Sequence, residues 1–430
     1  MDSKILDVFL PVKDYIVRLE DFDLIKIIGR GSYGDVHYAI HKTTGTKAAL
    51  KKLLVDELDE VQLEYFIREV LILAYYDNFF LVSFLGFSPS NPYLIITEFV
   101  PCGSLFDALR RKPRSPSLDG TDKTKIAIGI IEGMICLHNN KVIHRDLKSL
   151  NILLDNNKLP KICDFGISRA IDENNLGNMT VRIGTFHWMA PEMLDSDSYS
   201  YKVDVYAFAI ILWEMLTSQV PYQGQDPLKI LLNVKNNGMR PVIPPDCNEG
   251  LSKLMTRCWD QDPDVRPTFV ELYEIFRDEE IHFNDANIDE IHKFFEQFPV
   301  SEDALHPKSV TNSVSDETKN IQPNQINFED LDNVLNSKIS ADISDDLQPG
   351  ISRTENEDNS YSEEESISIS KENKNSSGQY LTEQRGKSES MIQQININDV
   401  NSLKIDSKKD EIKDSNEDDT NKDKKKDKKK

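Results

Sequence analysis

Cysteine is scarce in this sequence of 430 residues, and the few cysteines present form no recognisable pattern. The five cysteines, at positions 102, 136, 163, 247 and 258, include no C-x-x-C pair and no metal-ligand spacing. This excludes a small disulfide-stapled scaffold and a zinc module, and it favours free thiols in a reducing compartment. We therefore expect an intracellular, cytoplasmic protein.

Long apolar runs are also missing. No run approaches the roughly 18 residues of a membrane-spanning helix, and the apolar stretch 5–10 is too short and interrupted for a signal peptide. Asp at position 2 and the lack of a prenylation box argue against lipid anchors. We expect no transmembrane segment. With 51 basic and 73 acidic residues the net charge is −22, which argues against a specific nucleic acid partner.

The most informative segment that is present reads HRDLKSLN, from His144 to Asn151, and Asp164-Phe165-Gly166 follows 13 positions after that Asn. An Asp to accept a hydroxyl proton, a Lys for a phosphoryl group, and an Asn and an Asp for Mg²⁺ are the groups that phosphoryl transfer needs. A single tripeptide could arise by chance. The ordered pair, with Asn five residues after the first Asp, argues against chance.

A glycine-rich pattern G-x-G-x-x-G-x-V spans residues 29–36 and follows the strand-like run 24–28. Because glycine has no Cβ, backbone N–H groups in such a loop can approach phosphates closely. The same pattern could open a dinucleotide-binding unit, in which a helix follows at once. Residues 36–40 are β-branched and aromatic instead, which predicts a second strand and a hairpin.

Lys51 ends an apolar, strand-like segment and is the expected phosphate-binding lysine, whereas Lys52 points to the opposite face of the strand. Glu69 lies 18 positions after Lys51 in a segment with apolar residues at helical spacing. We predict that Glu69 forms an ion pair with Lys51. Glu64 on the same segment is the alternative partner.

Three further motifs complete the set: residues 184–192 end in Ala-Pro-Glu, 204–208 begin an apolar helix, and 258–269 contain Cys-Trp and Arg-Pro. With them the chain resembles the eukaryotic protein kinases, and among these the tyrosine-kinase-like (TKL) group of serine/threonine kinases. The resemblance covers roughly residues 22–277.

The resemblance implies an α+β, bilobal protein kinase fold, with a small antiparallel β-sheet lobe carrying one helix and a larger, mainly helical lobe. The expected boundaries are a lead over 1–21, a kinase domain over 22–277 (small lobe to about 96, large lobe from about 101), a possible extra helix over 278–300 and a tail over 301–430. The extra helix either packs on the domain or serves as a docking element.

The resemblance also implies roles for individual residues, with ATP and Mg²⁺ as cofactors. Asp146 would accept or orient the acceptor hydroxyl, Lys148 would steady the γ-phosphoryl group, and Asn151 and Asp164 would hold Mg²⁺. Lys51, oriented by Glu69, would bind the α- and β-phosphates. The implied nucleotide site consists of Ile28, Gly29, Gly31, Gly34, Val36, Ala49, Lys51, Thr97, Glu98, Val100 and Leu153.

Several supporting residues follow from the same resemblance. Leu73, Phe84, His144 and Phe165 would form an apolar column that stacks in the active state, although such residues are buried in nearly any fold. Glu192 and Arg266 would pair, and Asp204 would hold the catalytic loop from beneath. Two departures from the family stand out: Ala209 replaces a usual glycine, and residues 75–80 replace the common His-Pro-Asn turn, so the docking of the small-lobe helix does not carry over from the family.

The acceptor preference rests on Lys148 and on Thr185, whose hydroxyl would shape a shallow acceptor site. These residues favour Ser/Thr protein substrates and leave dual specificity open. Thr180 is the expected activating phosphorylation site, through an arginine such as Arg145. Tyr33, at the tip of the glycine-rich loop, is either a regulatory site or only part of a flap.

The last 130 residues contain 29 acidic and 19 basic side chains and three aromatic residues, so they contribute −10 to the net charge. Such a composition buries too little apolar surface to offset chain entropy, which predicts a disordered tail. Its lysine-rich end, 422–430, is either a solvated charge run or a binding segment, which would leave tail-docked partners and nuclear entry open.

Two hypotheses about function remain. The first is an active ATP-dependent serine/threonine kinase in intracellular signalling. The second is a nucleotide-binding scaffold that works through its tail. Lys51, Asp146, Asn151 and Asp164 are all present, which favours the enzyme.

Overall fold

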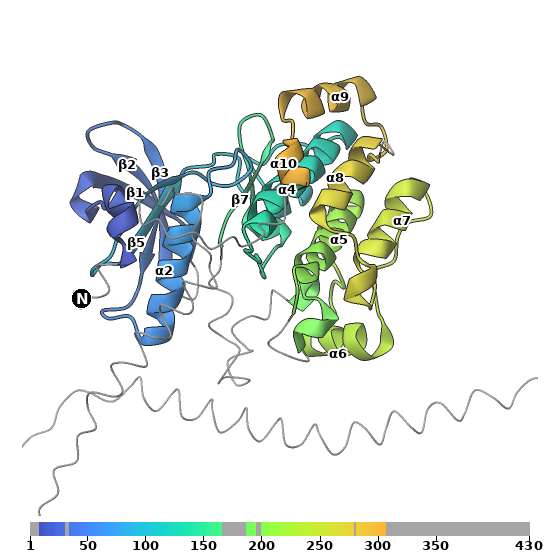
Figure 1. Ribbon diagram of the computed structural model, residues 1–430, viewed down its shortest axis with the longest axis horizontal. Helices are drawn as coiled ribbons and strands as arrows, with labels where there is room; N and C mark the ends of the chain where they lie inside the picture. Colours follow the sequence, from blue (N-terminus) through green and yellow to red (C-terminus); the bar gives the residue numbers. More distant parts are fainter. Residues whose placement is uncertain (1–7, 31–33, 166–185, 195–198, 279–280, 307–430) are drawn as a thin grey trace, which may run out of the picture. The chain divides into compact units, whose positions relative to one another are not determined.

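A computed structural model describes residues 8–30, 34–165, 186–194, 199–278 and 281–306, and the fold is given for these residues (Figure 1). The segment before the sheet contains two short 3-10 helices, η1 (Leu10–Tyr15) and η2 (Leu19–Asp21). The predicted lead therefore contains helical turns. Phe9 and Val12 of this segment are buried, and the Phe9 ring lies 4.8 Å from Phe87 and 6.2 Å from Phe66.

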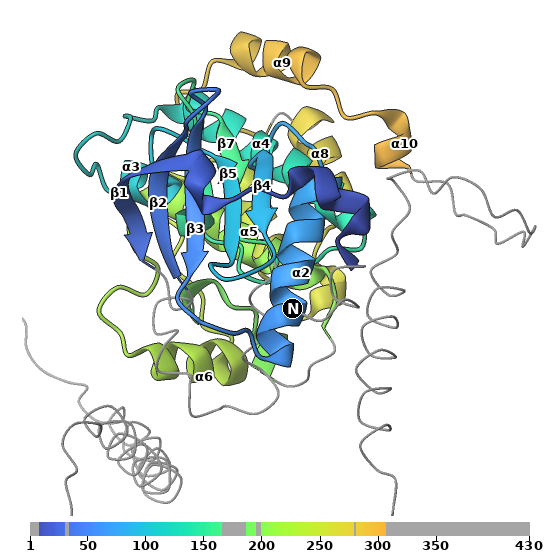
Figure 2. The same cartoon turned by 90° about the vertical axis from the view of Figure 1, so that its left-hand side faces the viewer.

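The small lobe is a five-stranded antiparallel sheet in the order β1-β2-β3-β5-β4. Its elements are β1 (Phe22–Arg30), β2 (Gly34–His41), β3 (Lys47–Leu53), β4 (Phe84–Ser88), β5 (Leu94–Glu98) and the helix α2 (Glu60–Tyr75). β1 and β2 pair antiparallel, so the predicted hairpin is confirmed and the dinucleotide-binding alternative is excluded. Figure 2 shows α2 and the lead at the β4 side of this sheet.

One face of the sheet has a small apolar core of its own. Ala48 and Leu50 of β3 are fully buried with Ala39, Leu94 and Ile96 in one small core. Because side chains alternate along a strand, Ala49 and Lys51 lie on the opposite face. Lys52 shares the face of Leu50, as predicted from the period of a strand.

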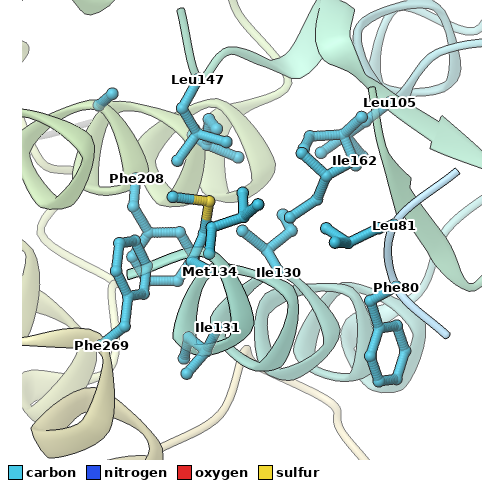
Figure 3. Close-up of a cluster of buried hydrophobic side chains, with 14 of the residues drawn as sticks. Phe80, Leu81, Leu105, Ile130, Ile131, Met134, Leu147, Ile162, Phe208 and Phe269 are labelled. Atoms are coloured by element: carbon cyan, nitrogen blue, oxygen red, sulfur yellow. The ribbon is translucent and has the colours of Figure 1, made fainter. Parts of the chain in front are cut away.

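The large lobe is built around two helices, α4 (Gly120–Asn139) and α5 (Lys202–Thr217). Residues 203–215 of α5 are buried on every side, which is typical of a helix at the centre of a core. Figure 3 shows Met134 of α4 near Phe208 and Phe269 in this core. The other elements are α3 (Leu105–Leu109), η3 (Ser149–Asn151), β6 (Ile152–Leu154), β7 (Pro160–Ile162), η6 (Phe186–Trp188), η7 (Pro191–Leu194), α6 (Pro227–Asn237), α7 (Glu249–Cys258), η8 (Pro263–Val265) and α8 (Phe269–Asp278).

The described residues thus form the predicted α+β fold with a β-sheet lobe and a helical lobe, and that prediction is confirmed. Ala209 is fully buried in α5. Across the residues that the structure describes, every helix is too short or too polar to span a bilayer.

Two more helices follow α8: α9 (Ile288–Gln297), within the range where apolar spacing predicted a helix, and α10 (Glu302–Leu305). The composition-based boundary of the tail at residue 301 is wrong, because the packed chain continues to His306. Ser301 caps α10 through the N–H of Ala304, and Leu305 is buried. One apolar side chain and one cap are too small a signal for a compositional window to detect. The predicted tail from 307 onward lies outside the described residues.

Glu132 in the middle of α4 is a buried carboxyl, and burial raises its pKa to about 8. Its Oε1 atom has no hydrogen-bond partner among the described residues. The folded state therefore retains a proton that the unfolded chain releases near pH 4.5. Stability from this group is full below pH 4.5 and is lost as the pH rises through about 8.

We predict that Glu132→Gln stabilises the protein at pH 8 by on the order of a few kcal/mol relative to wild type and changes it little at pH 5. Denaturant unfolding at both pH values measures the difference. Glu296→Gln, at an exposed position of α9, is the control. An equal effect of Glu132→Gln at both pH values would contradict the prediction.

Candidate active site

Lys51 lies at the centre of a cluster of charges on the face of the sheet that faces α2. Its Nζ is 3.0 Å from Oε1 of Glu69 on α2 and 3.6 Å from Oδ1 of Asp164, just after β7. Burial opposes the charge on Lys51, but the carboxylates of Glu69 and Asp164 outweigh burial and raise the pKa of the ammonium group. Lys51 is therefore charged and fixed between two carboxylates from separate elements.

The position of Glu69 resolves the choice between the two carboxylates of α2. Glu69 is 3% exposed and contacts Lys51 with both oxygens. Glu64 lies one turn away and pairs with Arg68 at 3.3 Å. The helix begins at a capping box in which Asp59 accepts a hydrogen bond from the N–H of Gln62, so its start is defined locally.

The start of the predicted catalytic loop, residues 144–151, is held by Asp204 of α5. Asp204 accepts the backbone N–H groups of His144 and Arg145 at 2.8 and 2.9 Å, and its Oδ2 lies 2.9 Å from Nε2 of His138. Burial opposes ionisation of Asp204, but the hydrogen bond and charge of His138 outweigh it and lower the pKa of this carboxyl. The structure thus places Asp204 beneath the loop, where the resemblance implied it.

Within that loop Asp146, Lys148 and Asn151 converge. Oδ2 of Asp146 is 2.6 Å from Nζ of Lys148 and accepts from Nδ2 of Asn151 at 3.1 Å. Nδ2 of Asn151 also donates to the carbonyl of Asp146 at 2.9 Å. Oδ1 of Asp146 is buried and has no hydrogen-bond partner among the described residues.

The four residues of the predicted apolar column are placed as follows. His144 is fully buried and its ring lies 5.6 Å from that of Phe165, which is also buried. Leu73 of α2 is buried, and Phe84 of β4 is half-buried with its ring 5.0 Å from Tyr15 of the lead. The contact with Tyr15 could not be predicted from the kinase motifs, because the lead precedes them.

Cys163 lies between these groups, immediately before Asp164. Burial, reinforced by the charge of Asp164, raises the pKa of the Cys163 thiol well above its usual value. A thiol held in its protonated form is a weak nucleophile. Its Sγ donates to the carbonyl of Asn151 at 3.4 Å, which fits a structural thiol.

Strand register brings together the predicted nucleotide-site residues of the sheet. Val36 is opposite Lys51 and Ala49 is opposite Thr97, so all four share one face. Gly34 begins β2, where a Cβ would meet the carbonyl oxygen of Lys52 at 2.2 Å. This glycine is required by strand pairing, which adds a second reason to the phosphate approach inferred from sequence.

The remaining nucleotide-site residues lie around this face. Ile28 and Gly29 lie near the end of β1, and Leu153 is in β6. Val100 is buried in the segment that connects the two lobes. The backbone N–H of Val100 makes no hydrogen bond to another described residue, whereas the N–H of Phe99 donates to Lys47. The side chain of Glu98 is engaged by Lys161 at 3.1 Å.

The donor set fits Mg²⁺ and a polyphosphate. The side chain of Asp164 is 55% exposed and offers carboxylate oxygens, and the amide oxygen of Asn151 is left over when its nitrogen binds Asp146. Such oxygens are the ligands that Mg²⁺ prefers. Lys51 and Lys148 supply the cations that phosphate oxygens need.

Glu214 of α5 is a buried residue that sequence reasoning missed. Its carboxylate accepts hydrogen bonds from Arg110 at 2.7 Å, from the hydroxyl of Ser149 at 2.9 Å and from the indole of Trp188 at 2.7 Å. Burial raises the pKa of Glu214 to about 7, against the opposing effect of Arg110. Glu214 thereby ties the catalytic loop to the segment after residue 185. No local pattern marks it within an apolar helix.

Glu192 and Arg266 form the pair that the resemblance implied. Nη1 and Nη2 of Arg266 donate to the two oxygens of Glu192 at 2.6 and 2.9 Å. Arg266 is almost fully buried, so the bidentate partner compensates a desolvated charge. The predicted residues Gly31, Tyr33, Thr180 and Thr185 lie outside the described residues.

Comparison with known proteins agrees with this geometry. Residues 22–276 match the family described as "Protein tyrosine and serine/threonine kinase". The chain is similar to serine/threonine-protein kinase STY46 of Arabidopsis thaliana, with 38% identity over 251 residues, which are 57% of this chain and 42% of the relative. It is also similar to STY17 of the same plant, with 34% identity over 263 residues, 61% of this chain and 45% of the relative.

A third relative is the probable serine/threonine-protein kinase drkC of Dictyostelium discoideum, with 39% identity over 251 residues, which are 57% of this chain and 33% of that protein. The chain covers less than half of the length of each of these three relatives.

We predict that Asp204→Asn destabilises the fold by about 1–3 kcal/mol, because an amide nitrogen would face a backbone N–H that Asp204 now accepts. Denaturant unfolding measures the change. Asp226→Asn is the matched control: Asp226 caps α6, and Asn is an equally good cap. Equal stability of the two variants would contradict the role of Asp204.

Proposed function

Since the chain belongs to the protein tyrosine and serine/threonine kinase family, we propose that it is an ATP-dependent serine/threonine kinase. It transfers the γ-phosphoryl group of ATP to Ser or Thr hydroxyls of protein substrates. We also propose that it acts in the cytoplasm in intracellular signalling, with Thr180 as its regulatory phosphorylation site and its C-terminal tail as a region for docking partners.

The observation that carries this proposal is the position of Lys51 between Glu69 and Asp164, at 3.0 and 3.6 Å. A lysine that binds phosphates must be held by α2, and a Mg²⁺ ligand must lie beside the same phosphates. Both conditions are met at once by one ammonium group.

The chain's own residues account for the handling of the acceptor. Asp146 accepts the proton of a substrate hydroxyl, and Lys148 and Asn151 orient its carboxylate through Oδ2. Lys148, 2.6 Å from this carboxylate, also supplies positive charge beside the transferring phosphoryl group. When bound, Mg²⁺ would neutralise phosphate charge, held by Asn151 and Asp164.

The preference for Ser and Thr rests on Lys148 and on the names of the relatives, two serine/threonine-protein kinases and one probable serine/threonine-protein kinase. Thr185, the second residue on which the preference was based, lies outside the described residues. Dual specificity therefore remains the alternative that a substrate profile must test.

We predict that Lys51→Met lowers phosphate transfer to a peptide substrate by at least about 10²-fold, because a charge that stabilises the transition state is lost. Lys52→Met is the matched control, since Lys52 is the next residue of β3 and lies on the opposite face. Asp164→Ala is expected to be equally inactive. Radiolabelled phosphate incorporation measures all three, and wild-type activity retained in Lys51→Met and Asp164→Ala would favour the scaffold.

A peptide-library profile at defined Mg²⁺ gives a second prediction. We expect phosphate on Ser and Thr acceptors, because Lys148 occupies the position typical of serine/threonine kinases. Phosphoamino-acid analysis of the products measures the preference. A profile dominated by Tyr would overturn the interpretation of Lys148.

A further inference from the structure

The segment 281–306 continues the chain beyond the residues that match the kinase family, 22–276. It is nevertheless built into the large lobe along α4 and α8 (Figure 1; Figure 2). Thr124 accepts the N–H of Phe283 at 3.0 Å, Lys125 pairs with Glu290 at 2.7 Å, and Asn139 donates to the carbonyl of Ala304 at 2.7 Å. Apolar side chains of the segment are buried beneath it: Ile281, Phe283, Ile291, Phe294 and Leu305.

Phe298, the residue that follows the C-terminus of α9, packs on the turn between α2 and β4. The Phe298 ring lies 4.8 Å from Phe79 and 5.1 Å from Phe80, and Phe294 lies 6.1 Å from Phe80. Phe294 and Phe298 are 5.0 Å apart. We call these four rings the aromatic clasp. Its two small-lobe members occupy the turn in which this chain departs from the common His-Pro-Asn pattern.

The turn is docked on α4 by the Phe80 ring. Figure 3 shows Phe80 and Leu81 beside α4, with Ile162 nearby. A Cβ on Gly129 of α4 would meet the Phe80 ring at 2.7 Å, so the helix has space for this ring only because residue 129 is glycine. Phe298 also packs on this ring, with the two ring centroids 5.1 Å apart. The turn is therefore held between α4 and the segment beyond the family match.

The same turn connects to both partners of Lys51. It follows directly after α2, which carries Glu69. The carbonyl of Phe80 accepts the N–H of Ile162 at 2.7 Å, and the N–H of Val82 donates to the carbonyl of Ile162 at 3.0 Å. Ile162 precedes Asp164 by two residues. A displacement of the turn would thus move both carboxylates that hold Lys51.

We propose that Phe298 is a positioning residue for phosphoryl transfer, which acts through the aromatic clasp to hold the α2–β4 turn and, with it, Glu69 and Asp164. This inference rests on the proposed kinase function. It gives the segment 281–306 a role within the catalytic unit. Phe298 contacts neither nucleotide nor acceptor, so its effect must pass through the turn.

The adjacent helix position provides a matched control. Phe295 is half-buried like Phe298 and lies in the last turn of α9, which Phe298 follows directly, but its ring packs on Tyr273 of α8 at 5.4 Å. Phe295→Ala removes the same number of atoms and loosens α9 without touching the turn. Phe298→Leu keeps an apolar side chain at the clasp and serves as the conservative variant.

The test compares the full chain as wild type, Phe298→Ala, Phe298→Leu and Phe295→Ala, assayed below the unfolding temperature of every variant. We expect Phe298→Ala to lower kcat/KM by about 10-fold or more, since small displacements of catalytic groups cost this much. Phe298→Leu should recover most of the activity, and Phe295→Ala should stay within about twofold of wild type. Equal losses in Phe298→Ala and Phe295→Ala would overturn the proposal.

Amide hydrogen exchange makes the test independent of the enzymatic assay. Phe298→Ala should raise exchange in α2 and at residues 161–165, whereas Phe295→Ala should raise it only where α9 meets α8. If wild type itself transfers no phosphate, the proposed function fails while the exchange result still tests the clasp. Unchanged exchange in α2 of Phe298→Ala would overturn the inference even in an active enzyme.

Discussion

The structure of the site depends on one buried ammonium group that needs two carboxylates. Lys51 is 17% exposed at its side chain, so its charge must be compensated within the protein. Glu69 approaches from α2 and Asp164 from the end of β7, and the pairing fixes helix, sheet and loop relative to one another. Because removing one partner would leave a buried charge, the arrangement is much more strongly constrained than a surface ion pair.

A second constraint is the attachment of the catalytic loop to the buried helix α5. The catalytic loop has little regular structure, so its backbone N–H groups need acceptors from elsewhere. The buried helix α5 supplies them through Asp204 and also ties down Ser149 and Trp188 through Glu214. Two carboxylates on one helix thereby position a loop whose own sequence could not hold it. The turn at Phe80 likewise joins the small lobe to β7, through backbone hydrogen bonds between Phe80, Val82 and Ile162.

Sequence patterns predicted the fold and the convergence of the charged groups, because each motif is short and its spacing reflects a local structure. The hairpin after Gly29 follows from the β-branched and aromatic residues of 36–40, and the place of Lys52 on the face opposite Lys51 follows from the period of a strand. Pairing of Lys51 with Glu69 was expected from the family resemblance, and the structure has that pair. The boundary at 301 was wrong because composition averages over segments, whereas one buried Leu305 is enough to keep a short helix in place.

By itself, then, the sequence determined the hairpin and the identity of the charged residues through periodicity and short motifs, and it determined the two lobes through its resemblance to protein kinases. Only the tertiary structure decided that Glu214 bridges the catalytic loop and that Phe298 covers Phe80. The physical reason is distance along the chain. Side chains 65 and more residues apart meet only after the helices between them have packed, and no local pattern of residues encodes such a contact.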